Sequence, residues 1–340
     1  MEKDREIRFQ WGTGRSQYLK VWLLLALITF VAVCVVMYNV YVTMNPDSGP
    51  EGRRARSVAQ QTVKYFSQDP SVKSAKVTLA EADTSASAVN VDVYFKNDTS
   101  VDKAADLVSS VLQDSTIREK KKHISEFHIF MKWSVSGSSI NLDVDCASAP
   151  DLVRGRLLSS LASVGDSKSI EGAVAKRSGP IVDYGEVSSV PSSFTQAGNP
   201  YSVKRFALSG WRIESHPDDE GKTFPAAPFA QIIGVAQQVA SPGKLAVSPY
   251  TNEGVSISLL GLTDHAGLNL GVESAAHIVH GLSGCQELGI SRLLLDVQGQ
   301  EMSVATERVG FSCQNGAWVA EGRGHTGDLE NQILQSVSQL

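Results

Sequence analysis

Hydrophobic residues in this chain form one long unbroken run and, after it, short alternating and helical patterns. The run from Val21 to Tyr38 contains no charged residue, and no charge follows before Asp47. A helix of roughly 20 apolar residues is long enough to cross the hydrocarbon core of a bilayer, and residues 39–43 bring the run to that length. The pattern therefore predicts a transmembrane helix over residues 21–43.

Beyond this run, the pattern repeatedly predicts a helix followed by two strands. In Val89–Phe95 and Ile140–Cys146, apolar residues alternate with polar ones, which is typical of strands with one buried face. Short turns between paired strands favour antiparallel pairing, with helices on one face of the sheet. We therefore expect an α+β fold with mainly antiparallel sheets, and not a doubly wound parallel sheet.

The same order occurs in both halves of the chain, on either side of a segment rich in Ser, Pro, Gly and Asn. In the first half, strands are predicted over 76–80, 89–95, 127–134, 140–146, 170–175 and 181–187, and helices over 53–67, 101–113 and 151–163. In the second half, strands are predicted over 203–213, 244–247, 255–262, 292–297 and 304–313, and helices over 227–240, 272–283 and 328–340. The low-complexity segment between the halves is predicted to be a linker.

The chain is predicted to begin with a short cytoplasmic tail (1–20), a transmembrane helix (21–43) and a juxtamembrane linker (44–52). A first α+β domain (53–187), a linker (188–202) and a second α+β domain with a C-terminal helix (203–340) follow. The apolar run is too long for the core of a typical cleaved signal peptide, and no small-x-small site follows it, which indicates an uncleaved signal anchor. Lys and Arg flank both ends of the helix in similar numbers. Long C-terminal domains translocate largely regardless of charge. We expect the N-terminus in the cytoplasm and the C-terminal domains outside it.

Composition narrows the possible functions. The net charge of −5 argues against general nucleic-acid binding, and 42% hydrophobic residues are enough for real cores. The cysteines leave the compartment open. A bridge between Cys285 and Cys313 is possible in an exported domain, but buried free thiols are the favoured interpretation, and Cys34 is expected to face lipid or to pack against a neighbouring residue.

One short motif suggests chemistry. His216-Pro-Asp-Asp-Glu220 is similar to the HPDDE motif of zinc-dependent sugar N-deacetylases of the PIG-L type. The resemblance implies that His216 and Asp219 bind zinc, that Asp218 is the general base, and that the late histidine ligand is His265. A metal lowers the pKa of bound water, and a carboxylate then accepts its proton. The alternative is a polar turn before the helix predicted from Ala227, and this is the interpretation we favour.

Two further clusters are interpreted as structural. Glu273, His277 and His280 fall on one flank of a predicted helix without the spacing of a zincin motif. The basic stretch from Arg118 to His123 is predicted to be a solvated loop, with contact to an anionic surface as its functional alternative.

The leading prediction is a non-enzymatic, single-pass membrane-anchored interaction or scaffold protein in a cell-envelope or transport and secretion assembly. Its predicted partners are membrane lipid, through residues 21–43, and other membrane or envelope proteins, without nucleic acid and without a cofactor; homo-oligomerisation is left open. The alternative is an anchored metal-dependent hydrolase that uses the segment from His216 to Asp219. A third possibility is a sensor or ligand-binding module, which predicts a concave apolar pocket between the two halves.

Overall fold

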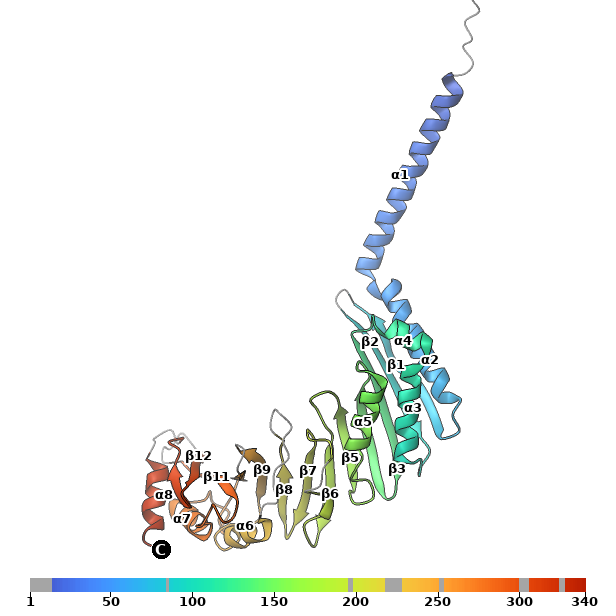
Figure 1. Cartoon of the computed structure of the whole chain (residues 1–340). Helices are drawn as coiled ribbons and strands as arrows, with labels where there is room; N and C mark the ends of the chain where they lie inside the picture. Colours follow the sequence, from blue (N-terminus) through green and yellow to red (C-terminus); the bar gives the residue numbers. More distant parts are fainter. Residues whose placement is uncertain are drawn as a thin grey trace, which may run out of the picture.

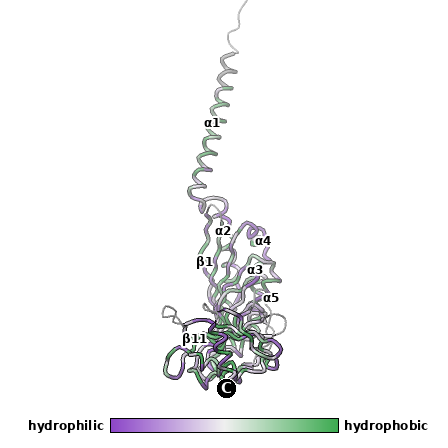
Figure 2. Tube along the Cα trace, turned by 90° about the vertical axis from the view of Figure 1, so that its left-hand side faces the viewer, coloured by the Kyte–Doolittle hydropathy of each residue, from purple (hydrophilic) through white to green (hydrophobic). Residues whose placement is uncertain are grey.

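A computed structural model describes residues 14–83, 86–194, 198–217, 228–250, 254–299, 306–323 and 328–340 of the 340-residue chain. Helix α1 (Gly14–Met44) includes an apolar stretch, Val21–Met44, that is long enough to cross a membrane and is not buried against any other part of the described protein. In Figures 1 and 2, α1 projects from one end of the molecule as a separate hydrophobic rod. Such a helix is compatible with a membrane anchor or a signal sequence.

The connection between α1 and the rest of the protein is a tight, hydrogen-bonded turn. It consists of the 3-10 helix η1 (Pro46–Ser48) and the start of α2 (Pro50–Ser67), which begins before the predicted residue Arg53 because proline is well suited to a first helical turn. Arg56 binds both the Asp47 carboxylate and the Asp47 carbonyl oxygen, each at 2.8 Å. A side chain at Gly52 would collide with the Asp47 carbonyl. These contacts hold α2 in a fixed position relative to η1.

Within the described residues, the strands form one sheet of thirteen strands whose spatial order is the same as their order in the chain. Their bounds are β1 Val72–Ala82, β2 Ser87–Phe95, β3 Glu126–Val135, β4 Ser138–Asp145, β5 Ser169–Val174, β6 Ile181–Val187, β7 Val203–Leu208, β8 Trp211–Ser215, β9 Lys244–Tyr250, β10 Gly254–Leu260, β11 Ile290–Gln298, β12 Thr306–Gln314 and β13 Ala317–Ala320. The sheet curves away from α1 toward the C-terminus (Figure 1).

Pairing in this sheet alternates regularly between antiparallel and parallel. The antiparallel hairpins β1–β2, β3–β4, β5–β6, β7–β8, β9–β10 and β11–β12 are each joined to the next by a parallel pair, and β13 adds antiparallel to β12. A parallel pair needs a long crossover, which is usually helical. The predicted helix-strand-strand order is therefore present. The expectation of mainly antiparallel sheets did not include the parallel pairs that join each hairpin to the next.

The crossovers place helices along one face of the sheet. Between successive hairpins lie α3 (Val101–Gln113) with α4 (Ser115–Lys121), then α5 (Pro150–Ser160), the 3-10 helix η2 (Ser192–Phe194), α6 (Phe229–Ala236) and α7 (Val272–Gly281), and α8 (Leu329–Val337) follows β13. The apolar sides of these helices cover the alternating apolar residues of the strands, which form one hydrophobic core. The opposite face of the sheet, called the open face below, has no covering layer within the described residues.

A row of inward-facing residues shows that the core continues through the predicted linker. Strand pairing aligns Ile170 with Val182, Val182 with Lys204, Lys204 with Ser215, and Ser215 with Val247. The sheet therefore crosses from the first predicted domain to the second without a break. The structure therefore does not confirm the expected division into two α+β modules.

Residues 188–202 contain an anchored element where we expected only a linker. Phe194 of η2 is buried, and its ring packs against Phe206 and Phe229 at centroid distances of 4.8 and 5.6 Å. The Lys204 ammonium, which comes from β7, donates to the carbonyl oxygens of Ser193 and Phe194 at 2.9 and 3.0 Å. Burial lowers the pKa of Lys204, and the two carbonyls accept hydrogen bonds from the partly buried ammonium group.

Glycine turns explain two further differences from the predicted strands. The strand predicted over 203–213 is the hairpin β7–β8, because Ser209 and Gly210 adopt positive φ values of 52° and 80°. Asn315 and Gly316, at 54° and 80°, form the turn that leads into the unpredicted strand β13. Two successive residues at positive φ are typical of the tight turns that join hairpins, and Asn-Gly is their strongest sequence signal.

The outer edge of β1 is protected against pairing with another strand. Its register against β2 is interrupted twice, between Val72 and Ser74 and between Val77 and Leu79. Bulges of this kind bend and twist an edge strand, and lysines such as Lys73 and Lys76 make it less able to add a further strand. At the other end of the sheet, the edge strand β13 is only four residues long.

The anchored junction predicts that Phe194→Ala destabilises the folded chain by about 3–5 kcal/mol, because the substitution removes a fully packed aromatic ring and leaves a cavity. The free energy of unfolding in urea would measure the change. Val190→Ala is the matched control. Val190 lies in the same segment with 36% of its surface exposed, so its loss should stay within about 0.5 kcal/mol. Equal, small effects of both substitutions would mean that the segment is a simple linker.

Candidate functional site

The middle of the open face carries a cluster of charged side chains from two adjacent strands, β8 and β9, centred on Glu214 of β8. Arg212 and Glu214 share this face because side chains two residues apart in a strand point the same way. Lys244 of β9 pairs with Arg212 in the strand register and so lies diagonal to Glu214. Arg212 Nε and Lys244 Nζ lie 2.8 and 2.6 Å from the Glu214 carboxylate, and His216 Nε2 lies 3.4 Å from it.

Glu214 is nearly buried, whereas the cations around it remain accessible. Its side chain is 7% exposed, against 58% for Arg212 and 39% for Lys244. Burial raises the pKa of Glu214, but the hydrogen bond from Lys244 and the charges of Lys244, Arg212 and His216 outweigh burial and lower the pKa overall. The carboxylate therefore stays ionised at neutral pH. It is placed to orient cations and not to donate a proton.

Further ion pairs extend this arrangement along the open face. Arg205 Nε lies 2.7 Å from Asp183 Oδ2, which ties β7 to β6 across the predicted domain boundary. Arg292 of β11 makes a two-pronged contact with Glu321, at 2.9 Å from Nε and 2.8 Å from Nη2, and its guanidinium lies 5.1 Å from the centre of the Tyr250 ring. Cations on the C-terminal part of this face thus lie next to carboxylates, which fixes their positions.

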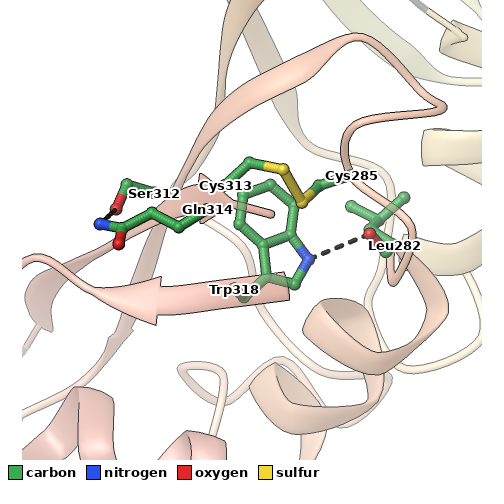
Figure 3. Close-up of a disulfide and its surroundings, with 6 residues drawn as sticks. All are labelled: Leu282, Cys285, Ser312, Cys313, Gln314 and Trp318. Atoms are coloured by element: carbon green, nitrogen blue, oxygen red, sulfur yellow. Dashed lines mark hydrogen bonds between the residues drawn. A yellow bond between two sulfur atoms is a disulfide. The ribbon is translucent and has the colours of Figure 1, made fainter. Parts of the chain in front are cut away.

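A disulfide joins the crossover after α7 to strand β12. Cys285 and Cys313 are bonded, with their Cα atoms 5.9 Å apart, so the favoured interpretation of these two residues as free thiols was wrong. Figure 3 shows the Trp318 ring of β13 beside the bridge, and its indole nitrogen donates to the Leu282 carbonyl at 3.0 Å. Cys146 is a buried free thiol, as expected, and burial raises its pKa.

The C-terminal helix is held to the sheet by a buried carboxylate that sequence reasoning did not single out. Glu330 of α8 accepts hydrogen bonds from the backbone N–H groups of Gly310, Gly322 and Arg323. Its side chain thereby satisfies donors at the end of the β12–β13 hairpin. An acidic residue in the first turn of an amphipathic helix was the available signal, but the pattern does not show that it points inward.

The residues of the predicted zinc site fall into two groups. Asp218 and Asp219 lie outside the described residues. His216 follows β8, where its backbone N–H donates to Val247 in the middle of β9. His265 lies in the turn after β10, and its Nε2 atom is 3.4 Å from the Gln238 carbonyl oxygen. Because β9 and β10 are antiparallel, this turn is at the Lys244 end of β9. The structure therefore does not bring the two histidines together, and the deacetylase assignment stays a prediction.

No other metal-binding arrangement is found within the described residues, where no three His, Cys, Asp or Glu side chains are grouped to hold an ion. The side chains of Glu273, His277 and His280 lie exposed on α7. The basic stretch from Arg118 to His123 is not a simple loop, because most of it forms α4. Lys121 there donates to the carbonyl oxygens of Cys146 and Ser148, and Lys120 donates to Ser57.

Comparisons with known proteins leave the family open: no family model matches this chain, and no similar curated protein or solved structure was found.

The ion cluster predicts a specific pH dependence for Glu214→Gln. Because the folded-state pKa of Glu214 is below its ordinary value of 4.5, its contribution to stability is complete above pH 4.5 and is lost as the pH falls through the folded pKa. The free energy of unfolding of the variant should be lower than that of the native chain at pH 7, and this difference should be smaller at a second, acidic pH well below 4.5.

Glu171→Gln is the control for this measurement, because Glu171 is an exposed residue of the open face that makes no ion pair with any other described residue. It should show no comparable change between the two pH values. A difference between Glu214→Gln and the native chain that is the same at both pH values would contradict the lowered pKa.

Proposed function

We propose that this chain is a single-pass, membrane-anchored scaffold outside the cytoplasm, which presents its curved sheet to other proteins of a cell-envelope or transport and secretion assembly. The observation that carries the proposal is the combination of a fully exposed apolar helix with a stiff sheet that extends away from it. A rigid element of this kind sets the position of whatever binds its face or edge relative to the bilayer.

The continuity of the sheet supports a mechanical role. Hydrogen-bonded pairing runs from β1 to β13, and the junction at Phe194, Phe206 and Lys204 is packed and hydrogen-bonded on its inner side. The ion pair between Arg205 and Asp183 crosses the same junction on the open face. Both faces of the junction therefore resist bending, so a partner bound near the C-terminus would be held in place by the anchor.

The disulfide supports the proposed orientation. Structural disulfides persist in oxidising compartments and are rare in the cytosol. The bridge between Cys285 and Cys313 lies in the C-terminal half, so its formation requires this half to reach such a compartment. A cytoplasmic N-terminus and an extracytoplasmic sheet satisfy this requirement with a single membrane crossing.

The disulfide gives a test of orientation and of stability. In cells quenched with acid and treated with a thiol-blocking reagent, Cys285 and Cys313 should remain unlabelled until a reductant is added. The double variant Cys285→Ser, Cys313→Ser should lose about 3–4 kcal/mol of stability, the value that the chain-entropy model gives for cysteines 28 residues apart. Full labelling before reduction would place the sheet in the cytoplasm and contradict the proposal.

The scaffold role predicts contacts on the open face in intact membranes. A photo-reactive amino acid at Asn141, which is exposed on that face, should form adducts with another protein after irradiation. The matched position is Leu152, which is 58% exposed on α5 in the helix layer and should form few or none. Adducts from Leu152 alone, or from neither position in cells that express the whole assembly, would argue against the open face as the contact surface.

A further inference from the structure

A hollow of about 350 Å³ lies at one end of the first hairpins, away from the charged cluster of β8 and β9. Its lining comes from the start of β1, the ends of β2 and β3 and the start of β4, and consists of Lys73, Tyr94, Phe95, Lys96, Asn97, Lys132, Trp133, Ser134 and Ser139. Strands β2 and β3 are parallel, and Tyr94 pairs with Lys132 in their register. The hollow thus lies at the carboxyl ends of a parallel pair, a place where sheets commonly bind ligands.

The three lysines of this hollow differ from the other cations of the open face. Among the described residues, Lys73, Lys96 and Lys132 have no carboxylate within ion-pair distance. In contrast, the cations elsewhere on the face lie next to acids, as in the pairs Lys76–Asp92, Arg205–Asp183, Arg212–Glu214, Lys244–Glu214, Arg292–Glu321, Arg308–Asp296 and Arg323–Glu321. Like charges that line one hollow without a paired carboxylate attract an anion from solution.

An aromatic ring and neutral polar groups accompany the lysines. Tyr94 is half-buried, and the Lys76 ammonium lies 5.8 Å from the centre of its ring. Asn97, Ser134 and Ser139 add an amide and two hydroxyl groups to the lining. Acidic groups on the strands and loop around the hollow include Asp92, which is paired with Lys76, Asp143, which is paired with His128, and Asp98, which is exposed in the loop after β2. The hollow therefore combines positive charge, one aromatic face and hydrogen-bonding groups.

The floor of the hollow is rigid. The rings of Phe95 and Trp133 pack at a centroid distance of 5.4 Å, and the buried indole nitrogen of Trp133 donates to the Thr99 carbonyl at 3.0 Å. The backbone N–H groups of Lys96 and Asp98 donate to Ser71 and Ser134, each at 2.8 Å. The elements that carry the lysines are therefore held together before any ligand arrives, which reduces the entropy lost on binding.

We propose that this hollow binds a phosphate group carried on a sugar or polyol. The ammonium groups of Lys73, Lys96 and Lys132 act as compact positive charges on the phosphate oxygens, a role for which lysine is well suited. The apolar face of the sugar lies on the Tyr94 ring, and its hydroxyl groups reach Asn97 and the serines. A single aromatic platform fits one sugar unit, whereas single-stranded nucleic acids bind to successive aromatic side chains. The proposal holds whether or not the scaffold role is correct.

Binding would be measured by calorimetry with the full chain in nanodiscs of neutral phosphatidylcholine. Glucose 6-phosphate and poly(glycerol phosphate) serve as probes, and glucose is the uncharged comparison. Both phosphate probes should bind and glucose should not, and tighter binding of the polymer would identify a polymer as the source of the ligand. The double variant Lys73→Gln, Lys132→Gln should weaken phosphate binding at least tenfold, and the binding should fall with rising salt concentration.

The control is the double variant Lys64→Gln, Lys122→Gln, which removes the same charge at exposed positions outside the hollow and should change binding less than twofold. Tyr94→Leu should reduce the preference for glucose 6-phosphate over inorganic phosphate, while an unchanged unfolding temperature shows that each variant is folded. The proposal fails if neither phosphate probe binds, if the control loses as much affinity as the hollow variant, or if an oligonucleotide binds more tightly than poly(glycerol phosphate).

Discussion

The parallel hydrogen bonding between each hairpin and the next is the interaction on which the whole structure depends. A hairpin alone would expose its apolar side, and two strands are at best marginally stable in water. Parallel pairing aligns the inward-facing residues of successive hairpins into rows, as from Ile170 through Val182 to Val247, and the crossover helices then cover those rows. The crossover between β6 and β7 has no α-helix within the described residues to cover the sheet. There the ring of Phe194 packs on the core instead, and Lys204 binds the backbone carbonyl of Phe194.

The same one-sided construction explains where binding chemistry can lie. Because the helices bury one face, charged and polar side chains collect on the other, where cations and carboxylates mostly neutralise each other. Glu214, which binds Arg212 and Lys244, is the most buried carboxylate among these pairs. The lysine hollow at the ends of β2 and β3 departs from this rule, and the bulged edge of β1 beside it discourages strand addition. Ligand binding at the hollow and protein contact along the face are thus compatible on one molecule.

Much of the local structure could be predicted from the sequence, whereas the pairing between successive hairpins could not. Alternation identifies β2 and β4 because each has one buried face, but a period of two does not show which strand lies beside which, so the parallel pairs were missed. The composition of residues 188–202 predicts a linker, because one buried aromatic residue, Phe194, hardly changes the composition of the segment. Asn315-Gly316 is a sequence signal for a hairpin turn, and it would have predicted the strand β13 that follows it. The hollow combines Lys73, Lys96 and Lys132 from separate segments, and the bond between Cys285 and Cys313 joins a loop to a strand. Only a three-dimensional arrangement brings such residues together.

The identity of spatial and chain order has a consequence for how the protein is made. Every hairpin adds to the edge left by the one before it, and no strand has to be inserted between two that are already in place. A chain that emerges from a membrane pore starting at its N-terminus can therefore assemble its sheet progressively, with one unfinished margin at a time. The bridge between Cys285 and Cys313 joins two segments of the C-terminal part of the chain, so it can form only after most of the strands are present. During synthesis, unwanted association between chains can begin at the unpaired edge of the most recently added strand, and not at the bulged edge of β1.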